Sequence, residues 1–425
     1  MVKKEYLKKV ILQQKIHKSS FLKFATSTQK KDLSLNASLL KGRKMVHVNA
    51  TKEGGGVVEI LKSLIPYLRA LEIQCDWYYV SEEAGKKFFE ATDKIRNIFQ
   101  GSTENINDRE WATYEKLSKE IAQELDKIDC DVLIINDFQL LLAGSYCKNH
   151  KNKVFFNHLD TSAMHEKSWH RFFDFFNSYY KIVFSNKYFL HKRFQRGKVK
   201  IFTPAIDPLS QKQEIISQKQ ARLYLNQYGH IPEKGPLVVQ VSRFDVWKNP
   251  IGLIHAFRLI QDTFKNAVLV LVGFNEAKDN PLSKKVYEDV RGLADKSPEI
   301  FTFFSTKGKD VVKFTVMAQN AADIVVQNSI KEGFGLTATE AMWKNKPVIG
   351  GPAFGIREQI QDGKNGFIAR NSDELSQKIV FLLSHKKKSH QMGKEAHKSV
   401  EKNFLFPRFV LDHLKLYNSC LKKKN

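Results

Sequence analysis

The chain has 425 residues and a mass of 49.0 kDa, which is enough for two domains that each bury a core. Hydrophobic residues make up 42% and aromatic residues 12%, a composition that excludes an intrinsically disordered chain. No apolar run approaches the roughly 18–20 residues that cross a bilayer. The four cysteines have no zinc spacing, and the start lacks a hydrophobic signal core. We therefore expect a cytoplasmic protein that is not exported.

The net charge of +24 is concentrated at the two ends of the chain. Residues 1–44 contain twelve Lys or Arg against two acids, and residues 381–425 contain eleven against three. This balance suggests an anionic partner, such as a phosphorylated substrate or an acidic membrane surface at which the protein would be peripheral. A solvated lysine-rich surface explains the charge equally well. No nucleic-acid-binding motif is present, so no nucleic acid partner is expected.

Residues 1–44 are predicted to form one or two basic helices. A strand at 45–50, a glycine loop at 51–56 and a helix at 57–71 with one apolar face follow them. Further strands are predicted at 75–80, 132–136, 154–158, 181–185 and 199–203, with helical segments between most of them. This alternation implies a parallel sheet that is covered on both faces.

A second alternating series follows the polar segment 205–235. Its strands are predicted at 236–242, 267–273, 300–304, 323–327 and 347–350, and a last helix at 405–421 is expected to cross back to the first domain. The expected organisation is an α/β protein with two Rossmann-like domains that face each other across a cleft. The domain bounds are a basic extension at 1–44, a first domain at 45–212, a second at 213–404 and the terminal helix at 405–425.

Residues 329–350 contain the most informative motif, in which Glu332 and Glu340 bracket a glycine turn with seven residues between them. The turn follows a predicted strand and precedes a predicted helix at 337–344. Ligands bind at this edge of open α/β sheets, and free N–H groups at a helix start favour a phosphate. A carboxylate just before the turn can accept hydrogen bonds from sugar hydroxyls, and one inside the helix can reach a ribose. The pattern predicts a nucleotide-sugar site.

Two cations, Arg243 and Lys248, close the first strand of the second series, in the segment SRFDVWKNP. At the carboxyl edge of the sheet they can neutralise a departing diphosphate in place of a metal ion. A surface ion pair with Asp245 is the alternative. The DxD string at 129–131 lies before a strand, on the opposite edge of its sheet. No metal is therefore expected.

The first domain offers weaker candidates at the corresponding edge of its sheet. Gly55 and Gly56 lie between a strand and an amphipathic helix, where a ligand phosphate or sugar can approach the backbone, although any tight turn can use glycines. His158 and Asp160 end the strand at 154–158, and Asp137 ends its neighbour at 132–136. A histidine there can hydrogen-bond a sugar hydroxyl, but a structural role is the common one.

With these positions in hand, the chain resembles the retaining nucleotide-sugar glycosyltransferases of the GT-B fold that carry an E-x7-E motif. Within them it is most similar to the trehalose glycosyltransferring synthases, which join the glucose of a nucleoside-diphosphate glucose to glucose. The segments that carry this resemblance are 47–61, 204–212, 242–248 and 330–351. The resemblance implies a metal-independent enzyme that forms trehalose or a similar α-glucoside, with the nucleotide-sugar donor and the sugar acceptor as partners and without a cofactor.

The resemblance also implies a role for each matching residue. Glu332 would hold hydroxyls of the donor glucose, Glu340 would hold the ribose, and His158 would lie beside the transferred sugar. Arg243 and Lys248 would bind the diphosphate. The donor side would also include Gly55 and Gly56 and the backbone amides of Phe334, Gly335, Leu336 and Thr337. Asp137 and Asp160 would lie on the acceptor side.

Two departures fall on the acceptor side. The chain has Asn136-Asp137-Phe138-Gln139 where the synthases have His-Asp-Pro-Gln, and residues 158–162 also differ from the family's run. Alternatives therefore stay open: a phosphorylase that holds inorganic phosphate with Arg243 and Lys248, or a membrane-peripheral transferase that builds an envelope glycan. A homodimer is a further expectation. Contacts to the base are expected from residues 305–311, which carry no readable code.

Overall fold

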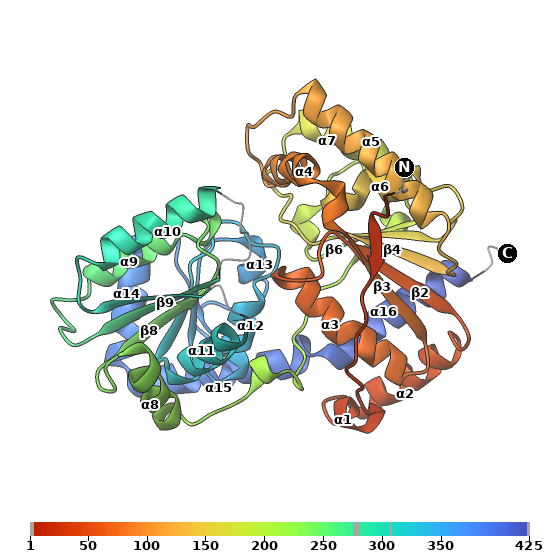
Figure 1. Cartoon of the computed structure of the whole chain (residues 1–425). Coiled ribbons are helices and arrows are strands. Elements are labelled where there is room, and N and C mark those ends of the chain that lie inside the picture. Colours follow the sequence, from red (N-terminus) through yellow and green to blue (C-terminus); the bar gives the residue numbers. More distant parts are fainter. Residues whose placement is uncertain (1–3, 275–280, 306–307, 423–425) are drawn as a thin grey trace. The chain divides into compact units, whose positions relative to one another are not determined.

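The computed structural model describes residues 4–274, 281–305 and 308–422 (Figure 1). The chain forms two compact units, each built around one sheet. Residues 1–204 and 406–425 form the first unit, and residues 205–405 form the second. Among the described helices, none is long and apolar enough to cross a membrane.

The first unit contains a seven-stranded sheet with the order β1-β3-β2-β4-β5-β6-β7. All neighbouring strands are parallel except the β1–β3 pair. The strands are β1 (Leu7–Lys9), β2 (Lys44–Asn49), β3 (Gln74–Val80), β4 (Val132–Asn136), β5 (Lys153–Asn157), β6 (Lys181–Phe184) and β7 (Val199–Ile201). The strands predicted from the hydrophobic pattern agree with these bounds to within two residues.

Helices cover both faces of this sheet (Figure 1). On one face lie α1 (Lys18–Leu22), α2 (Ser27–Ser38), α3 (Gly55–Ala70) and α16 (Phe406–Leu421). On the other face lie α4 (Lys86–Phe99), α5 (Asp108–Leu125), α6 (Leu141–Tyr146) and α7 (Glu166–Asn177). The last helix of the chain therefore completes the first unit, where it packs on α2 and α3.

The prediction that residues 1–44 form helices alone is wrong, because β1 pairs antiparallel with β3 and places Leu7 opposite Val80. Leu7 is buried, and the Glu124 carboxylate accepts hydrogen bonds from the N–H groups of Tyr6 and Leu7 at 3.0 and 2.8 Å. The strand is thus held by residues more than 70 positions away. A local pattern of lysines and short apolar stretches contains no sign of these partners.

The second unit contains a six-stranded, fully parallel sheet with the order β10-β9-β8-β11-β12-β13. The strands are β8 (Leu237–Val241), β9 (Val268–Phe274), β10 (Ile300–Ser305), β11 (Ile324–Gln327), β12 (Val348–Gly350) and β13 (Phe367–Ile368). The sequence pattern predicted all of them except β13, which is only two residues long.

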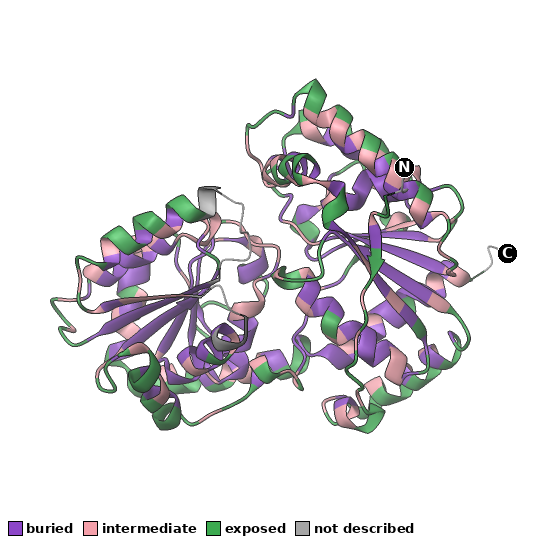
Figure 2. Cartoon of the chain, viewed as in Figure 1, coloured by how far each residue is buried: buried purple, intermediate pink, exposed green. Residues whose placement is uncertain are grey.

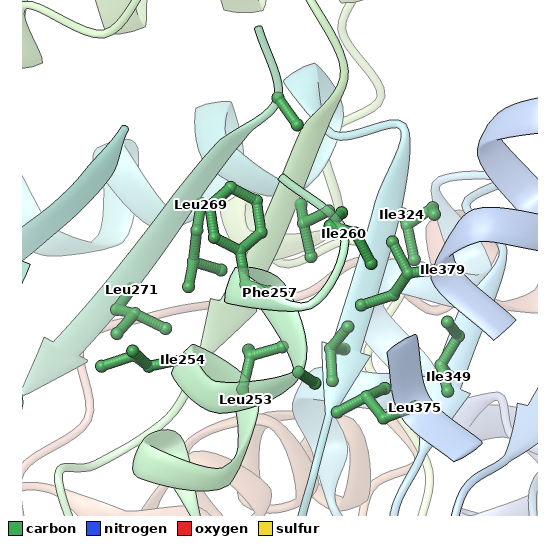
Figure 3. Packing of buried hydrophobic residues seen from close by; sticks show 14 of the residues in the cluster. Leu253, Ile254, Phe257, Ile260, Leu269, Leu271, Ile324, Ile349, Leu375 and Ile379 are labelled. Atoms are coloured by element: carbon green, nitrogen blue, oxygen red, sulfur yellow. The ribbon is translucent and has the colours of Figure 1, made fainter. Parts of the chain in front are cut away.

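The second sheet is also covered on both faces. Its helices are α8 (Gln218–Gly229), α9 (Pro250–Arg258), α10 (Pro281–Ala294), α11 (Gly308–Ala321), α12 (Leu336–Trp343), α13 (Phe354–Arg357), α14 (Ser372–Ser384) and α15 (Lys386–Asn403). One core, shown in Figure 3, joins α9 and α14 to the sheet through side chains such as Phe257, Ile379 and Leu269. The strands read as continuous apolar runs because both of their faces are buried (Figure 2).

Each strand order reverses at one point. In the first unit β2 leads to β3 on one side and has β4 on the other, and in the second unit β8 lies between β9 and β11. Parallel sheets open a crevice at such a point, beyond the carboxyl ends of the two strands. The residues that follow β4, β8 and β11 therefore occupy the places where a ligand is expected.

Candidate functional site

The reversal point of the second sheet holds a direct ion pair between Lys248 and Glu332. Lys248 ends the 3-10 turn η6 (Val246–Lys248) after β8, and Glu332 lies in the loop after β11. The Lys248 ammonium donates to Glu332 Oε2, with only 13% and 15% of the two side chains exposed. The structure therefore brings together two of the predicted site residues that are 84 positions apart.

Hydrogen bonds between the two loops hold this pair in place. The N–H of Ile330 donates to the carbonyl of Trp247 at 2.8 Å, and the Asn328 side chain donates to the carbonyl of Asn249 at 3.2 Å. The Ser329 hydroxyl lies 3.4 Å from Glu332 Oε2 and adds a weak contact. Asn249 also caps α9 at Gly252, as its place before Pro250 predicts. The carboxylate and the ammonium are thus fixed by backbone contacts.

The glycine turn is closed by close packing before α12. Gly335 is the N-cap of that helix and has φ +89°, and a Cβ there would meet Ile356 at 2.4 Å and Glu332 at 3.2 Å. The Gln359 amide donates to the carbonyl of Phe334 and, at 3.1 Å, to that of Gly355. The first N–H groups of α12 have no partner within the helix, because the helix begins at Leu336. The turn can thus receive an anion.

Glu340 lies inside α12 and is 6% exposed. Its carboxylate accepts no hydrogen bond from any residue in the described ranges, so its oxygens are available to the donors of a ligand. Lys344 lies one helical turn later; its ammonium donates to the carbonyl of Lys212 and lies 3.3 Å from that of Glu340. Burial lowers the pKa of Lys344 to about 8, and the Glu340 charge opposes this.

Arg243 occupies the exposed rim of the same loop. Its guanidinium lies 3.3 Å from the Asp245 carboxylate, and 43% of the side chain is exposed. Asp245 also accepts a hydrogen bond from the N–H of Trp247 at 2.9 Å, which starts η6. This is the ion pair that the sequence offered as the alternative to a ligand contact. An exposed arginine beside an anion site can still turn toward a ligand, since such surface pairs contribute little stability.

In the first unit, the partly exposed His158 begins a row of hydrogen-bonding side chains whose other members, Asn136, His47 and Tyr417, are buried. It follows β5, and its Nε2 lies 3.2 Å from Oδ1 of Asn136, the last residue of β4. The Asn136 amide donates to the carbonyl of Val48 at 3.2 Å and lies 3.4 Å from Nδ1 of His47. The row ends where His47 Nε2 meets the Tyr417 hydroxyl at 2.8 Å. Burial lowers the pKa of His158 to about 4.

The other two acids expected on the acceptor side differ in their surroundings. Asp137 follows β4 with φ +68° and accepts a hydrogen bond from the N–H of Phe138 at 3.2 Å. Desolvation raises the pKa of Asp137 to about 7, although backbone N–H groups and Arg96 oppose the change. Asp160 is 1% exposed, and its Oδ1 accepts hydrogen bonds from the N–H and hydroxyl of Ser162. Asp160 therefore stabilises the turn after β5.

The glycine loop of the first unit ends at the start of α3. The helix begins at Gly55, two residues before the predicted start, and Gly54 is its N-cap with φ +74°. Gly55 and Gly56 are exposed, and a Cβ on Gly55 would meet no atom within 4 Å. Both glycines therefore leave the amino end of α3 accessible.

A small hollow lies at the carboxyl edge of the first sheet, lined by His158, Asn157, Phe156 and apolar residues of β6, α3 and α16. Asn157 is 2% exposed, and its Oδ1 has no hydrogen-bond partner in the described part of the chain. Its amide nitrogen donates to the carbonyl of Leu159 at 2.9 Å, which fixes the orientation of the side chain. The hollow thus contains a buried acceptor.

One group of possible metal ligands was not expected from the sequence. Asp126, Cys147 and His150 place one ligand atom each within 4.8 Å of one another. Asp126 Oδ1 already accepts hydrogen bonds at 2.8 Å from the Cys147 thiol and from the N–H groups of Lys148 and Asn149. Burial raises the pKa of Cys147 to about 12. The group therefore closes the loop after α6 by hydrogen bonding.

Sequence reasoning missed several residues that shape the site. Gln359 clamps the glycine turn, and Gln327 accepts a hydrogen bond from the Thr337 hydroxyl at 2.9 Å. His47 and Tyr417 join His158 through Asn136. The only available signal was the position of His47 within a buried strand. Residues 305–311, from which base contacts were expected, fall mostly outside the residues whose side chains the structure describes.

The geometry places a cation paired with a carboxylate beside the start of α12, an arrangement that can bind an anionic, hydroxyl-rich ligand. Two family models match the chain. Residues 47–191 match the model described as "Trehalose synthase, N-terminal domain", and residues 226–399 match "Glycosyl transferases group 1". Among solved structures, an α,α-trehalose 6-phosphate synthase from Burkholderia multivorans superposes with a TM-score of 0.69 at 13% identity, covering 89% of this chain and 98% of that one. The fold is that of the GT-B glycosyltransferases.

Two relatives identify the family within the GT-B glycosyltransferases. The chain is 33% identical to the trehalose synthase of Pyrococcus horikoshii over 384 residues, which cover 90% of this chain and 91% of the relative. It is 30% identical to the trehalose synthase of Rubrobacter xylanophilus over 390 residues, which cover 91% and 92%. The chain belongs to the trehalose synthase family of glycosyltransferases.

Proposed function

We propose that the protein moves glucose from a nucleoside-diphosphate glucose to glucose or a related sugar acceptor, with retention at the anomeric carbon, and so forms trehalose or a similar α-glucoside. The observation that carries this proposal is the Lys248–Glu332 pair at the reversal point of the second sheet. An ammonium there can stabilise the charge that develops on a departing diphosphate. The paired carboxylate can accept hydrogen bonds from the hydroxyls of the glucose.

The same geometry supports the remaining contacts to the donor. The Glu340 carboxylate would accept hydrogen bonds from the ribose hydroxyls. The N–H groups from Phe334 to Thr337 would bind the diphosphate at the start of α12. Arg243 would leave Asp245 and pair with the same phosphates, since its guanidinium fits phosphate oxygens in a bidentate manner.

In the first unit, His158 would meet the transferred sugar. Asp137 and Asp160 would lie on the acceptor side, and Gly55 and Gly56 would allow the donor phosphates to approach the start of α3. The exposed glycines and the placement of His158 at the carboxyl edge of the sheet support these assignments.

We propose a reaction without a bound metal. The acceptor hydroxyl oxygen forms a bond to the anomeric carbon as the bond from that carbon to the phosphate oxygen breaks, on the same face of the sugar. The acceptor proton passes to the departing phosphate oxygen. Lys248 and Arg243 would stabilise the negative charge on the leaving group, which is the task that a divalent ion performs in other transferases.

The test is to incubate the purified protein with a panel of nucleoside-diphosphate glucoses plus glucose, with and without a chelator, and to identify the product by its linkage. An α,α-linked disaccharide formed equally well with the chelator supports the proposal. Release of glucose 1-phosphate from trehalose and inorganic phosphate, without any turnover of nucleotide sugars, would replace it with a phosphorylase.

We also propose that the basic ends rest on an acidic membrane surface. The packing of α16 on α2 brings parts of the two basic segments, residues 1–44 and 381–425, together, with Asn418 donating to the carbonyl of Asn36 at 3.0 Å. Near this contact, Leu35 and Leu39 are 62% and 61% exposed. Exposed leucines among lysines are typical of a surface that lies on anionic lipid.

A further inference from the structure

The row from His158 to Tyr417 determines which nitrogen of His158 carries the proton. The argument starts from a backbone carbonyl, which can only accept a hydrogen bond. The carbonyl of Val48 lies 3.2 Å from one end of the Asn136 side chain, so that end must be the amide nitrogen. The orientation of Asn136 is therefore fixed by the strand beside it.

The opposite end of Asn136 is then its carbonyl oxygen, Oδ1, and this atom lies 3.2 Å from His158 Nε2. A carbonyl accepts, so His158 Nε2 must donate and must carry the proton. In the neutral ring the lone pair is then on Nδ1. Nδ1 of His158 has no hydrogen-bond partner among the residues that the structure describes.

The second hydrogen of the Asn136 amide faces His47 Nδ1 at 3.4 Å, so that nitrogen accepts. A neutral His47 then carries its proton on Nε2 and donates to the Tyr417 hydroxyl at 2.8 Å. Burial lowers the pKa of His47 well below its usual value and that of His158 to about 4. All members of the row are thus neutral at physiological pH, and their donors and acceptors alternate without conflict.

We propose that Asn136 is a positioning residue that holds His158 in the Nε2–H tautomer, so that Nδ1 meets a substrate hydroxyl as a hydrogen-bond acceptor. This inference rests on the proposed function for its ligand, which is a sugar hydroxyl. It assigns a role to the asparagine that stands where the family pattern described above has a histidine. Unlike a histidine, an asparagine cannot become charged, so His158 stays free of a neighbouring cation.

Three further titratable groups lie near His158, whose own pKa is lowered by burial. His158 acts on the pKa values of His47 on β2 and His413 on α16, and Asp137 accepts a hydrogen bond from the backbone N–H of His158. His413 donates from Nδ1 to the carbonyl of Phe409 at 2.8 Å, and burial lowers its pKa to about 3. None of these histidines is charged near neutral pH, whereas the Asp137 carboxyl titrates near pH 7 in both the unaltered protein and the Asn136 variants, so a comparison between them isolates the effect of residue 136.

The experiment is long-range 1H–15N spectroscopy of the full-length protein with 15N-labelled histidine, with the His158 signals assigned by their loss in His158→Gln. At pH 7 we expect a protonated Nε2 that exchanges slowly with solvent, and a bare Nδ1. In Asn136→Asp the new carboxylate should raise the pKa of His158 by at least one unit, which is a tenfold shift in its protonation equilibrium. In Asn136→Leu the Nε2 proton should exchange at least tenfold faster.

Tyr417→Phe is the matched control. It removes the hydroxyl at the far end of the row but leaves the Val48 carbonyl to orient Asn136, so the His158 tautomer should not change. A protonated Nδ1 in the unaltered protein would overturn the proposal, and so would an unchanged pKa in Asn136→Asp. Because these readouts need no substrate, they stand apart from the glycosyl-transfer assay. If transfer also occurs, kcat should fall at least tenfold in Asn136→Leu at pH 7, because no group then holds the Nε2–H tautomer, with less change in KM for the donor.

Discussion

Lys248 and Glu332 form an ion pair that joins the loop after β8 to the loop after β11, and both side chains are largely buried. Under the proposed function, a donor substrate must share or displace each partner, since the ammonium and the carboxylate bind one another. The pair would then be a preformed site whose two groups keep each other in position until phosphate and sugar hydroxyls replace them.

Removal of one partner should affect both activity and stability. In Lys248→Ala the Glu332 carboxylate loses its counter-charge. In Glu332→Gln the Lys248 ammonium loses its counter-charge. We expect kcat/KM for the nucleotide sugar to fall at least 100-fold in each variant, which is the usual loss when one charge-stabilising donor is removed. The free energy of unfolding, measured in urea, should fall by about 1–3 kcal/mol in Lys248→Ala.

The double variant Lys248→Met/Glu332→Gln separates the two effects. It removes both charges, so its stability should recover most of the loss seen in Lys248→Ala, while its activity stays low. Full glucosyl transfer in either single variant would contradict the proposed role of the pair. Lys284→Ala, which removes an exposed partner of Glu288, is a suitable surface control and should change neither quantity.

Gly335→Ala tests the close packing of the glycine turn. An added Cβ meets Ile356 and Glu332 at a backbone with φ +89°. We expect the free energy of unfolding to fall by about 1–3 kcal/mol. The affinity for the donor should fall more than it does in the control variant below, because Glu332 must shift. Gly363→Ala is the matched control: it has φ +78° but nothing within 4 Å, so it reports the backbone strain alone. Equal losses of donor affinity in the two variants would argue against a role for the turn.

Asp137→Asn tests the raised pKa of Asp137, which is about 7 in the folded protein. The folded carboxyl binds its proton more tightly than the unfolded one, whose pKa is about 3.9. The stability of the protein should therefore fall as pH rises from about 4 to 7 and then level off. The variant lacks this penalty, so it should be the more stable protein at pH 8, by at most about 4 kcal/mol, and the advantage should vanish near pH 4.

The substitution leaves the local structure in place, because asparagine tolerates a positive φ and can still accept the hydrogen bond from the N–H of Phe138. Urea unfolding of both proteins at pH 4.5, 6 and 8 measures the effect. A stability difference that does not depend on pH would show that Asp137 is ionised throughout.

Flotation with lipid vesicles tests the basic surface near α2 and α16. We expect the protein to float with vesicles that contain anionic lipid at low salt and to be released at high salt, since such contacts are screened within about 10 Å at 0.1 M salt. Neutral vesicles should not bind. Leu35→Ser/Leu39→Ser should weaken flotation, because both leucines are exposed. Equal flotation with neutral vesicles would contradict an electrostatic contact.

Much of the fold could be predicted because its strands are buried on both faces. Runs such as β4 and β9 are continuously apolar and stand between amphipathic helices, and this pattern is local. The strand β1 could not be predicted in this way, since its hydrogen-bond partners are β3 and the distant Glu124. Two-residue β13 carries too little pattern to be distinguished from a turn.

The candidate site, like the fold, could be predicted from the sequence only in part. Glu332, Lys248 and the glycine turn could be placed because motifs at strand ends meet at the carboxyl edge of a parallel sheet. The direct pairing of Lys248 with Glu332 could not, since it depends on the geometry of two loops. The Asn136–His47–Tyr417 row was also hidden, because its members come from three separate segments and no local spacing relates them.

The position of α16 has a consequence for how the chain is made. The first unit needs residues 406–425, which are synthesised after the second unit is complete at residue 405. The earlier-synthesised half must therefore wait for the later one, and during synthesis the apolar surface that α16 will cover stays open to chaperones and proteases. A premature stop soon after residue 405 would leave the nascent protein with an intact second sheet and an unfinished first unit.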